Sequence, residues 1–395
     1  MPKNINQPGA LKTGAPQIPY QPRQPGELQP EDVVAAQEIP GFVGARVFIT
    51  LQKKTESKYL RKPNQDNILV HPTTGLVAVM DGVGGSVNGE LASRVTEREL
   101  PDRFAAAESE AKRMSAAELI EGLTEIPAER CAQRSDLAAK KQELKKTAEE
   151  IVAKDVDLGR KAYAILKAMQ DTNVMVAATR GATTACAGLI HETANGEKFA
   201  IIANVGDSGA FIRRKNGKIE RATPEDSVEE ALKEVKAEIN GMGIVDYLHQ
   251  HSDPITGKIP DSLPIPIPVT QDNVLAIGYS LVDFWTFESK GEKTIYTTYE
   301  AMKRTLTVVL GGRTPSPRLR VVKVEAGDEI LFCTDGIIDK YDNEAKQELD
   351  LEELSKDLSV GNDPVERLDN LRVIAHQKTT YKDNDDVAMV LVAVE

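Results

Sequence analysis

The chain has 395 residues, 41% of them hydrophobic and 28% charged, which is enough apolar material for one large domain or two ordinary ones. Its formal net charge of −12 disfavours nucleic acid or an anionic membrane as a partner, because such binding needs clustered positive charge. Three widely spaced cysteines give no disulfide framework or zinc pattern, and no apolar run is long enough for a signal peptide or a membrane span, so we expect a cytoplasmic protein.

Residues 1–40 are expected to form a disordered tail. They hold eight of the 21 prolines, a composition that cannot bury enough surface to offset chain entropy. Pro16, Pro19, Pro22 and Pro25 recur every third residue, which is the period of a polyproline II helix. The tail is therefore either an inert extended linker, which we favour, or a ligand for a Pro-recognising domain.

Four near-continuous apolar runs predict strands that are covered on both faces: 76–80, 199–203, 329–333 and 387–392. Residues from about 87 to 180 are rich in Ala, Glu, Lys and Leu and nearly free of Gly and Pro, which predicts helices. Within them, apolar residues recur at every seventh position: Leu137, Leu144, Ile151, Leu158 and Ile165. Because charged residues lie between them, we favour a helix that packs one apolar stripe on a sheet rather than a coiled coil.

A second irregular region covers residues from about 226 to 305. It contains four closely spaced prolines and the only tryptophan, Trp285, and it looks inserted. Because the strand-like runs are spread over the whole length from residue 41 to 395, we expect one elaborated domain there rather than two independent ones.

Acidic residues lie at the ends of the predicted strands. In an antiparallel sheet the end of one strand lies beside the start of its neighbour, so we expect these carboxylates to meet on one rim. One Asp-Gly pair alone is more simply a turn, but four clusters on separate strands favour a ligand site. The set comprises Asp81 after the first strand, Asp207 after the second, Asp335 and Asp339 after the third, and Asp383, Asp385 and Asp386 before the last.

The chemistry of this rim points to a hard divalent cation. Like charges gathered together need a positive ion among them, and a donor set without histidine or cysteine favours Mg²⁺ or Mn²⁺ over zinc or copper. Two such ions bridged by a carboxylate and a water would provide a hydroxide nucleophile and a clamp for a phosphoryl group. Alternative sites carry less weight: Gly82-Val83-Gly84 lacks the third glycine of a dinucleotide fingerprint, there is no P-loop, and His249 and His251 lie in a polar stretch.

Taken in order, these motifs resemble the type 2C metal-dependent protein phosphatases, which act on phosphoserine and phosphothreonine. Six motifs occur in the family's order and with similar spacing, which makes the resemblance specific. They are Arg61 with Asn64-Gln65-Asp66, then Asp81-Gly82-Val83-Gly84-Gly85, Gly181-Ala182-Thr183-Thr184, Asn204-Val205-Gly206-Asp207-Ser208, Gly327-Asp328 with Thr334-Asp335-Gly336, and Asp385-Asp386.

The resemblance implies an α+β fold, a four-layer αββα sandwich whose two central antiparallel sheets are flanked by helices. It also implies attack on phosphorus by a hydroxide that bridges two Mg²⁺ or Mn²⁺ ions. By position, Arg61 would grip the substrate phosphate, and Arg61, Asp81 and Asp335 would be the catalytic residues. The implied metal residues are Asp81 and the carbonyl of Gly82, Asp335, Asp385 and Asp66, with Asp207 and Asp339 for a third, weaker ion.

Compared with the family's minimum, the chain would carry a helical insertion at about 105–175 and an enlarged flap at about 226–305, where protein substrates would touch. Val83 stands where many members have a histidine or methionine, so water would have to protonate the leaving group. Gln65, Gly209 and Asp386 are further departures, but none removes a direct metal ligand. We therefore expect an active phosphatase that opposes a serine/threonine kinase; the alternatives are an inactive regulatory binding module and an esterase for small phosphate esters.

Overall fold

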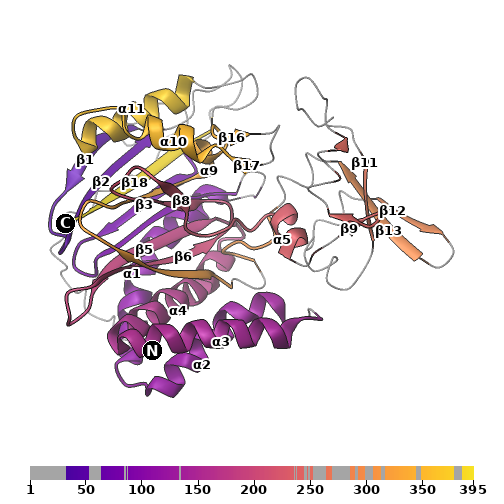
Figure 1. Cartoon of the computed structure of the whole chain (residues 1–395), viewed down its shortest axis with the longest axis horizontal. Coiled ribbons are helices and arrows are strands. Elements are labelled where there is room, and N and C mark those ends of the chain that lie inside the picture. Colours follow the sequence, from indigo (N-terminus) through magenta and orange to yellow (C-terminus); the bar gives the residue numbers. More distant parts are fainter. Residues whose placement is uncertain are drawn as a thin grey trace, which may run out of the picture.

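The computed structural model describes residues 33–52, 64–83, 86, 88–132, 135–234, 236, 238–243, 247, 250–251, 264–268, 285–289, 292–298, 306–312, 316–343, 348–377 and 385–395. Two antiparallel sheets lie face to face, and helices cover their outer faces (Figure 1). The predicted α+β sandwich, with its layers in the order αββα, is therefore confirmed.

The first sheet has six strands in the order β1 (Val33–Ile39), β2 (Ala45–Gln52), β18 (Val387–Val394), β15 (Glu329–Cys333), β7 (Gly209–Arg213) and β8 (Ile219–Arg221). The second has five, in the order β14 (Arg318–Val324), β6 (Lys198–Val205), β5 (Ala185–Glu192), β4 (Leu76–Asp81) and β3 (Asp66–His71). All four predicted strands are present, two in each sheet, and their continuous apolar runs are explained because both faces of each strand are buried.

Strand β1 corrects the expected extent of the tail. Residues 33–39 pair with β2 at the edge of the first sheet, so the folded part begins before residue 41. The polyproline-like segment at residues 16–25 lies outside the described residues.

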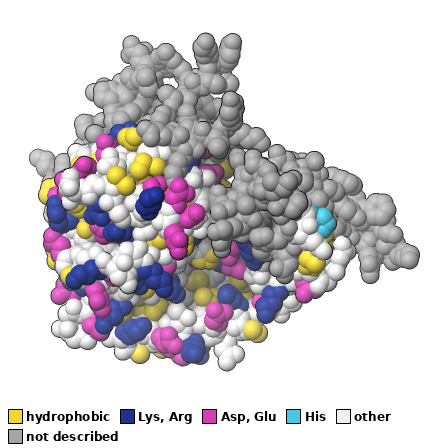
Figure 2. Space-filling model, turned by 45° about the horizontal axis from the view of Figure 1, so that its top comes forward, with side chains coloured by type: hydrophobic (Ala, Val, Ile, Leu, Met, Phe, Trp, Pro, Cys, Tyr) yellow, Lys and Arg dark blue, Asp and Glu magenta, His cyan; other side chains and the backbone are white. Residues whose placement is uncertain are grey.

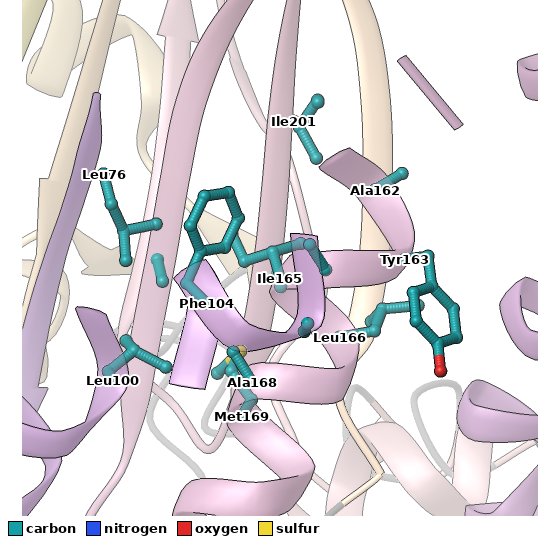
Figure 3. Packing of buried hydrophobic residues seen from close by; sticks show 14 of the residues in the cluster. Leu76, Leu100, Phe104, Ala162, Tyr163, Ile165, Leu166, Ala168, Met169 and Ile201 are labelled. Atoms are coloured by element: carbon teal, nitrogen blue, oxygen red, sulfur yellow. The ribbon is translucent and has the colours of Figure 1, made fainter. Parts of the chain in front are cut away.

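Four helices form the layer on the second sheet: α1 (Gly89–Ala111), α2 (Ala116–Ala128), α3 (Leu137–Lys154) and α4 (Val156–Ala178), with a short 3-10 helix, η2 (Glu129–Cys131), after α2. Figure 3 shows how Leu100 and Phe104 of α1 and Ile165 and Met169 of α4 gather in this layer, beneath Leu76 and Ile201 of the sheet. These side chains are fully buried or nearly so, and they hold the helices against the sheet.

The prediction of one continuous helical stripe on the sheet is wrong. The helix ends at Lys154 because Asp155 is extended, with φ −163°, and its carboxylate accepts the Leu158 N–H at 2.9 Å to begin a new helix. Helix α4 packs on the sheet, whereas α3 packs against α2 and α4 as an outer layer. The Asp155 cap therefore divides the residues of the seven-residue repeat between two helices.

The first sheet is covered by α9 (Asp335–Ile338), α10 (Leu351–Asp357) and α11 (Pro364–Gln377). Within the expected flap lie α5 (Val228–Glu234), the two-residue strands β9 (Glu238–Ile239) and β10 (Met242–Gly243), and a three-stranded sheet of β11 (Pro264–Pro268), β13 (Glu292–Thr298) and β12 (Trp285–Ser289). Proline-rich β11 lies at the edge of that sheet, where missing N–H donors are tolerated. Strands β16 (Asp342–Asn343) and β17 (Glu348–Leu349) form a small hairpin.

The surface of the described residues mixes both signs of charge. In Figure 2, basic and acidic side chains alternate over the described part of the face in view. Among the described helices, none combines the length and apolar character that a membrane crossing requires. Cys131, Cys186 and Cys333 are buried and form no disulfide bond.

Candidate metal centre

The acidic rim forms because the strand ends meet as the antiparallel pairing requires. Asp81 ends β4, and Asp66 begins β3 directly opposite it in the register. In the first sheet, Asp335 follows β15 and begins α9, while Asp385 precedes β18, the antiparallel neighbour of β15. Asp207 lies in the turn between β6 and β7, and so connects the two sheets.

Three carboxylates approach one another closely at this rim. One carboxylate oxygen from each of Asp81, Asp207 and Asp335 lies within 4.8 Å of the other two. Asp339 and Asp385 are near enough to act electrostatically on members of this cluster. The rim therefore concentrates negative charge at the junction of the two sheets.

Burial and mutual repulsion shift the protonation of these acids. Burial raises the pKa of Asp81 well above its ordinary value, and Asp66 and Asp207 raise it further. The pKa of Asp335 is raised in the same way by burial and then by Asp81 and Asp207. For Asp207, burial and the carboxylates of Glu225 and Asp339 raise the pKa to about 7. Arg221 lowers the pKa of Asp207 only in part, so burial and repulsion between the acids are not offset, and a cation bound among them would supply the missing positive charge.

Asp66 links the neighbouring strand ends of the site through a hydrogen bond. It is almost fully buried, and its Oδ2 accepts the hydroxyl of Thr334 at 2.7 Å. The Thr334 hydroxyl oxygen in turn accepts the backbone N–H of Ala388 at 3.0 Å. Thr334 therefore ties the β15 end, the β18 start and the β3 start together, directly beside Asp335.

Backbone contacts hold Asp81 in place. Its carbonyl accepts the Thr184 N–H at 2.8 Å and the Thr183 hydroxyl at 2.6 Å, and its N–H donates to the Thr184 hydroxyl oxygen at 3.1 Å. A β-carbon on Gly82 would lie 2.4 Å from the carbonyl carbon of Gly89, so glycine is needed for the close approach of helix α1. The threonine pair thus fixes the strand end that carries Asp81.

The donor set fits a hard divalent cation. The acids of the rim offer only oxygen atoms, and Asp207 Oδ1 is buried with no hydrogen-bond partner among the described residues. An unpartnered buried carboxylate oxygen between other carboxylates is stabilised best by a positive ion.

The structure distinguishes between the neighbouring acids before β18. Asp386 is buried, and its Oδ2 accepts the backbone N–H of Gln65 at 2.8 Å. Asp385 is exposed, and it also influences Asp81 and Asp335 electrostatically. Asp385 is therefore better placed than Asp386 to offer an oxygen, whereas Asp383 and Arg61 lie outside the described residues.

Arg221 is a residue that sequence reasoning missed. Its Nη2 donates to the Asp207 carbonyl at 3.0 Å, and Nη1 pairs with Glu225 at 3.3 Å. A β-carbon on Gly209 would lie 3.3 Å from Nη2, so the guanidinium fills the space beside that glycine. The sequence carries no local signal for it, because Arg221 is brought to Asp207 by the β7–β8 pairing, in which it lies opposite Phe211.

Within the described part of the chain, no histidine of the region at about 226–305 joins this rim. His251 is exposed, and its ring stacks on Tyr247 with centroids 4.2 Å apart. His249 lies outside the described residues.

Similarity to known proteins is found for a family model and for solved structures. The family model for protein phosphatase 2C matches residues 58–371. No curated protein sequence matches the chain. Solved structures similar to it include the serine/threonine phosphatase PstP/Ppp of Mycobacterium tuberculosis, at 17% identity over 89% of this chain and 99% of that one, with a TM-score of 0.45.

Two further structures resemble the chain at a similar level. The PPM Ser-Thr phosphatase MsPP of Mycobacterium smegmatis, in complex with cacodylate, is 16% identical over 92% of this chain and 100% of that one, with a TM-score of 0.47. The catalytic domain of PstP in complex with 2 manganese ions is 15% identical over 88% and 97% of the two chains, with a TM-score of 0.45.

Proposed function

Because the chain belongs to the protein phosphatase 2C family, whose members are serine/threonine phosphatases, we propose that it hydrolyses phosphoserine and phosphothreonine in proteins with the help of two Mg²⁺ or Mn²⁺ ions. The observation that carries this proposal is the approach of Asp81, Asp207 and Asp335 to within 4.8 Å. Family membership defines the reaction class, and the intact acids support an active site.

In this proposal Asp81, Asp335, Asp385 and the Gly82 carbonyl would hold the pair of ions, and Asp207 and Asp339 would hold a third, weaker one. When bound, such ions stabilise charge on the phosphoryl oxygens and make a water acidic enough to act as a nucleophile near neutral pH.

The chain's own residues orient this site. The hydrogen bonds from Thr184 and Thr183 to the Asp81 carbonyl fix the strand end that carries the Asp81 carboxylate. The hydrogen bond from Thr334 fixes the Asp66 carboxylate on the neighbouring strand. Val83 offers no group that transfers a proton, so the leaving alkoxide takes its proton from water. Arg61 would bind the substrate phosphate with its planar donor fork, as the family resemblance suggests.

Substrate choice is assigned to the region at about 226–305. A protein substrate would need contacts beyond the phosphoryl group, whereas a small ester would not. We expect a phosphoserine or phosphothreonine peptide to be hydrolysed with a kcat/KM at least about tenfold above that of an aryl phosphate, which corresponds to about 1.4 kcal/mol of additional transition-state binding.

The experiment compares both substrates at saturating Mn²⁺, the ion present in the PstP structure, with Asp335→Asn as the control. Equal kcat/KM for the two substrates would favour a small phosphate esterase. Activity that persists undiminished in Asp335→Asn would contradict the assignment of the site.

The cysteines bear on the cellular setting of the protein. Three buried cysteines without a disulfide bond suit a reducing compartment, so we place the activity in cytoplasmic signalling, opposite a serine/threonine kinase. The Pro-rich tail would serve as a linker or as a ligand for a Pro-recognising domain. Binding of a panel of such domains to the full chain and to a chain without residues 1–32 distinguishes the two roles.

A further inference from the structure

A buried carboxylate outside the acidic rim joins four segments of the fold. Asp226 follows β8 and is fully buried. Its Oδ1 accepts Nε of Arg318, from β14, at 2.7 Å, and also Nη2 of Arg130. Its Oδ2 accepts the backbone N–H of Gly206 at 3.0 Å. Both oxygens are therefore occupied, and the buried charge is offset by two guanidinium groups.

Residue 226 holds the Gly206 peptide from two sides. Besides accepting its N–H, it donates its own backbone N–H to the Gly206 carbonyl at 3.0 Å. Gly206 has φ +97°, and a β-carbon on it would lie 2.6 Å from the methyl group of Thr184. The turn before Asp207 is thus pressed against the threonine that supports Asp81, and the Asp226 contacts fix the backbone that leads into Asp207.

Arg130 reaches this carboxylate from the helical insertion. It lies in η2, at the end of α2, and its side chain is 11% exposed. Its Nη1 is buried and finds no hydrogen-bond partner among the described residues. Burying a guanidinium with an unsatisfied donor costs free energy, which an apolar side chain at the same position would avoid. The contribution of Arg130 is therefore its charge and its hydrogen bond to Asp226.

A separate contact anchors the same helix end without touching Asp226. The hydroxyl of Ser316, just before β14, donates to the carbonyls of Ile126 and Pro127 at 2.6 and 3.0 Å. Ser316 is fully buried. It therefore offers a matched control for the attachment of the insertion to the sheet.

We propose that Arg130 is a positioning residue for Asp207, through which the inserted helices set the geometry of the acidic rim. The route runs from the Arg130 guanidinium to the Asp226 carboxylate, to the Gly206 peptide and so to the Asp207 side chain. The inference rests on the proposed function, because Asp207 matters only if the rim binds cations.

The test is Mn²⁺ binding to the full chain, measured by titration calorimetry and by the electron paramagnetic resonance signal of free Mn²⁺. Asp207→Ala first identifies the binding step that depends on Asp207. Arg130→Gln is expected to weaken that step about tenfold, at the lower end of what loss of a contact behind a metal ligand produces. Arg130→Lys, which keeps the charge, is expected to restore part of the affinity.

Ser316→Ala is expected to lower the melting temperature while leaving this binding step within twofold of wild type. Equal weakening by Ser316→Ala and Arg130→Gln would overturn the proposal, since the insertion would then act through general stability. Wild-type affinity in Arg130→Gln would overturn it as well.

If Arg130→Gln does not fold, Arg130→Lys decides between the same outcomes: weaker Mn²⁺ binding than in Ser316→Ala supports the proposal, and equal binding overturns it. Mn²⁺-dependent phosphatase activity of the wild type is measured in parallel. Absence of both activity and Mn²⁺ binding in the wild type would overturn the proposed function and this inference together. An active, Mn²⁺-binding wild type whose Arg130 variants bind Mn²⁺ equally well would overturn only the inference.

Discussion

Replacing Asp207 by asparagine should stabilise the metal-free protein at neutral and alkaline pH. Burial, Glu225 and Asp339 raise the pKa of Asp207 from 3.8 to about 7 in the folded chain. An acid whose pKa is higher in the folded state favours folding below its unfolded pKa, and that contribution is lost as the pH rises through the folded pKa. The window for Asp207 therefore runs from about pH 3.8 to about pH 7.

The size of the effect follows from the two pKa values. Between 3.8 and about 7 there are about 3 pH units, and each unit corresponds to 1.36 kcal/mol, which gives about 4 kcal/mol above pH 7. Asparagine keeps the shape of the protonated acid but does not titrate. The stability advantage of Asp207→Asn should therefore grow by about 2 kcal/mol between about pH 5.5 and about pH 8.

Urea unfolding of both proteins in chelator, at about pH 5.5 and about pH 8, measures this difference. Added Mn²⁺ should reverse the order, because the wild-type carboxylate then gains a cation that asparagine binds poorly. Two outcomes would refute the reasoning that burial and repulsion destabilise the Asp207 carboxylate until a cation binds. One is a stability difference that is the same at the two pH values, and the other is an Asp207→Asn variant that remains more stable than the wild type in Mn²⁺.

Three further predictions concern the surroundings of the rim. Thr334→Val should lower the free energy of unfolding by about 1–3 kcal/mol, because the Asp66 carboxylate and the Ala388 N–H both lose a buried hydrogen-bond partner. Thr334→Ser keeps the hydroxyl and should retain most of the wild-type free energy of unfolding, as measured by urea unfolding. Gly336→Ala should lower the melting temperature by several degrees and reduce Mn²⁺ affinity, because its β-carbon would lie 2.0 Å from the Asp386 carbonyl oxygen, and an unchanged melting temperature would contradict that packing. Arg61→Ala should raise KM for a phosphopeptide more than it lowers kcat in steady-state kinetics, and the reverse would remove Arg61 from phosphate binding.

Much of the sandwich was predictable because its central strands are buried on both faces. Residues 330–333 and 387–392 are apolar throughout, as expected for short strands that are covered on both faces. Strand β1 was missed because it lies at a sheet edge, where its sequence includes Gln37 and Glu38 and resembles the preceding polar tail. The division of α3 from α4 was missed because one capping side chain, Asp155, decides it.

The acids of the rim could be found because they directly follow or precede recognisable strands. Their supports could not, because contacts such as Arg130 with Asp226 join residues 96 positions apart and leave no local pattern. Arg221 and Thr334 likewise act through hydrogen bonds that only the folded chain brings together. The acidic residues of the site were predictable from the sequence, whereas the residues that hold them in position are visible only in the structure.

Hydrolysis of an aryl phosphate by the wild type and by Asp335→Asn, with Mn²⁺, with Mg²⁺ and with chelator, tests the central claim most directly. We expect metal-dependent phosphate release by the wild type, and a loss of at least about a hundredfold in kcat for a variant that folds normally. Equal turnover by the two proteins at saturating metal, or no turnover by a well-folded wild type, would contradict it.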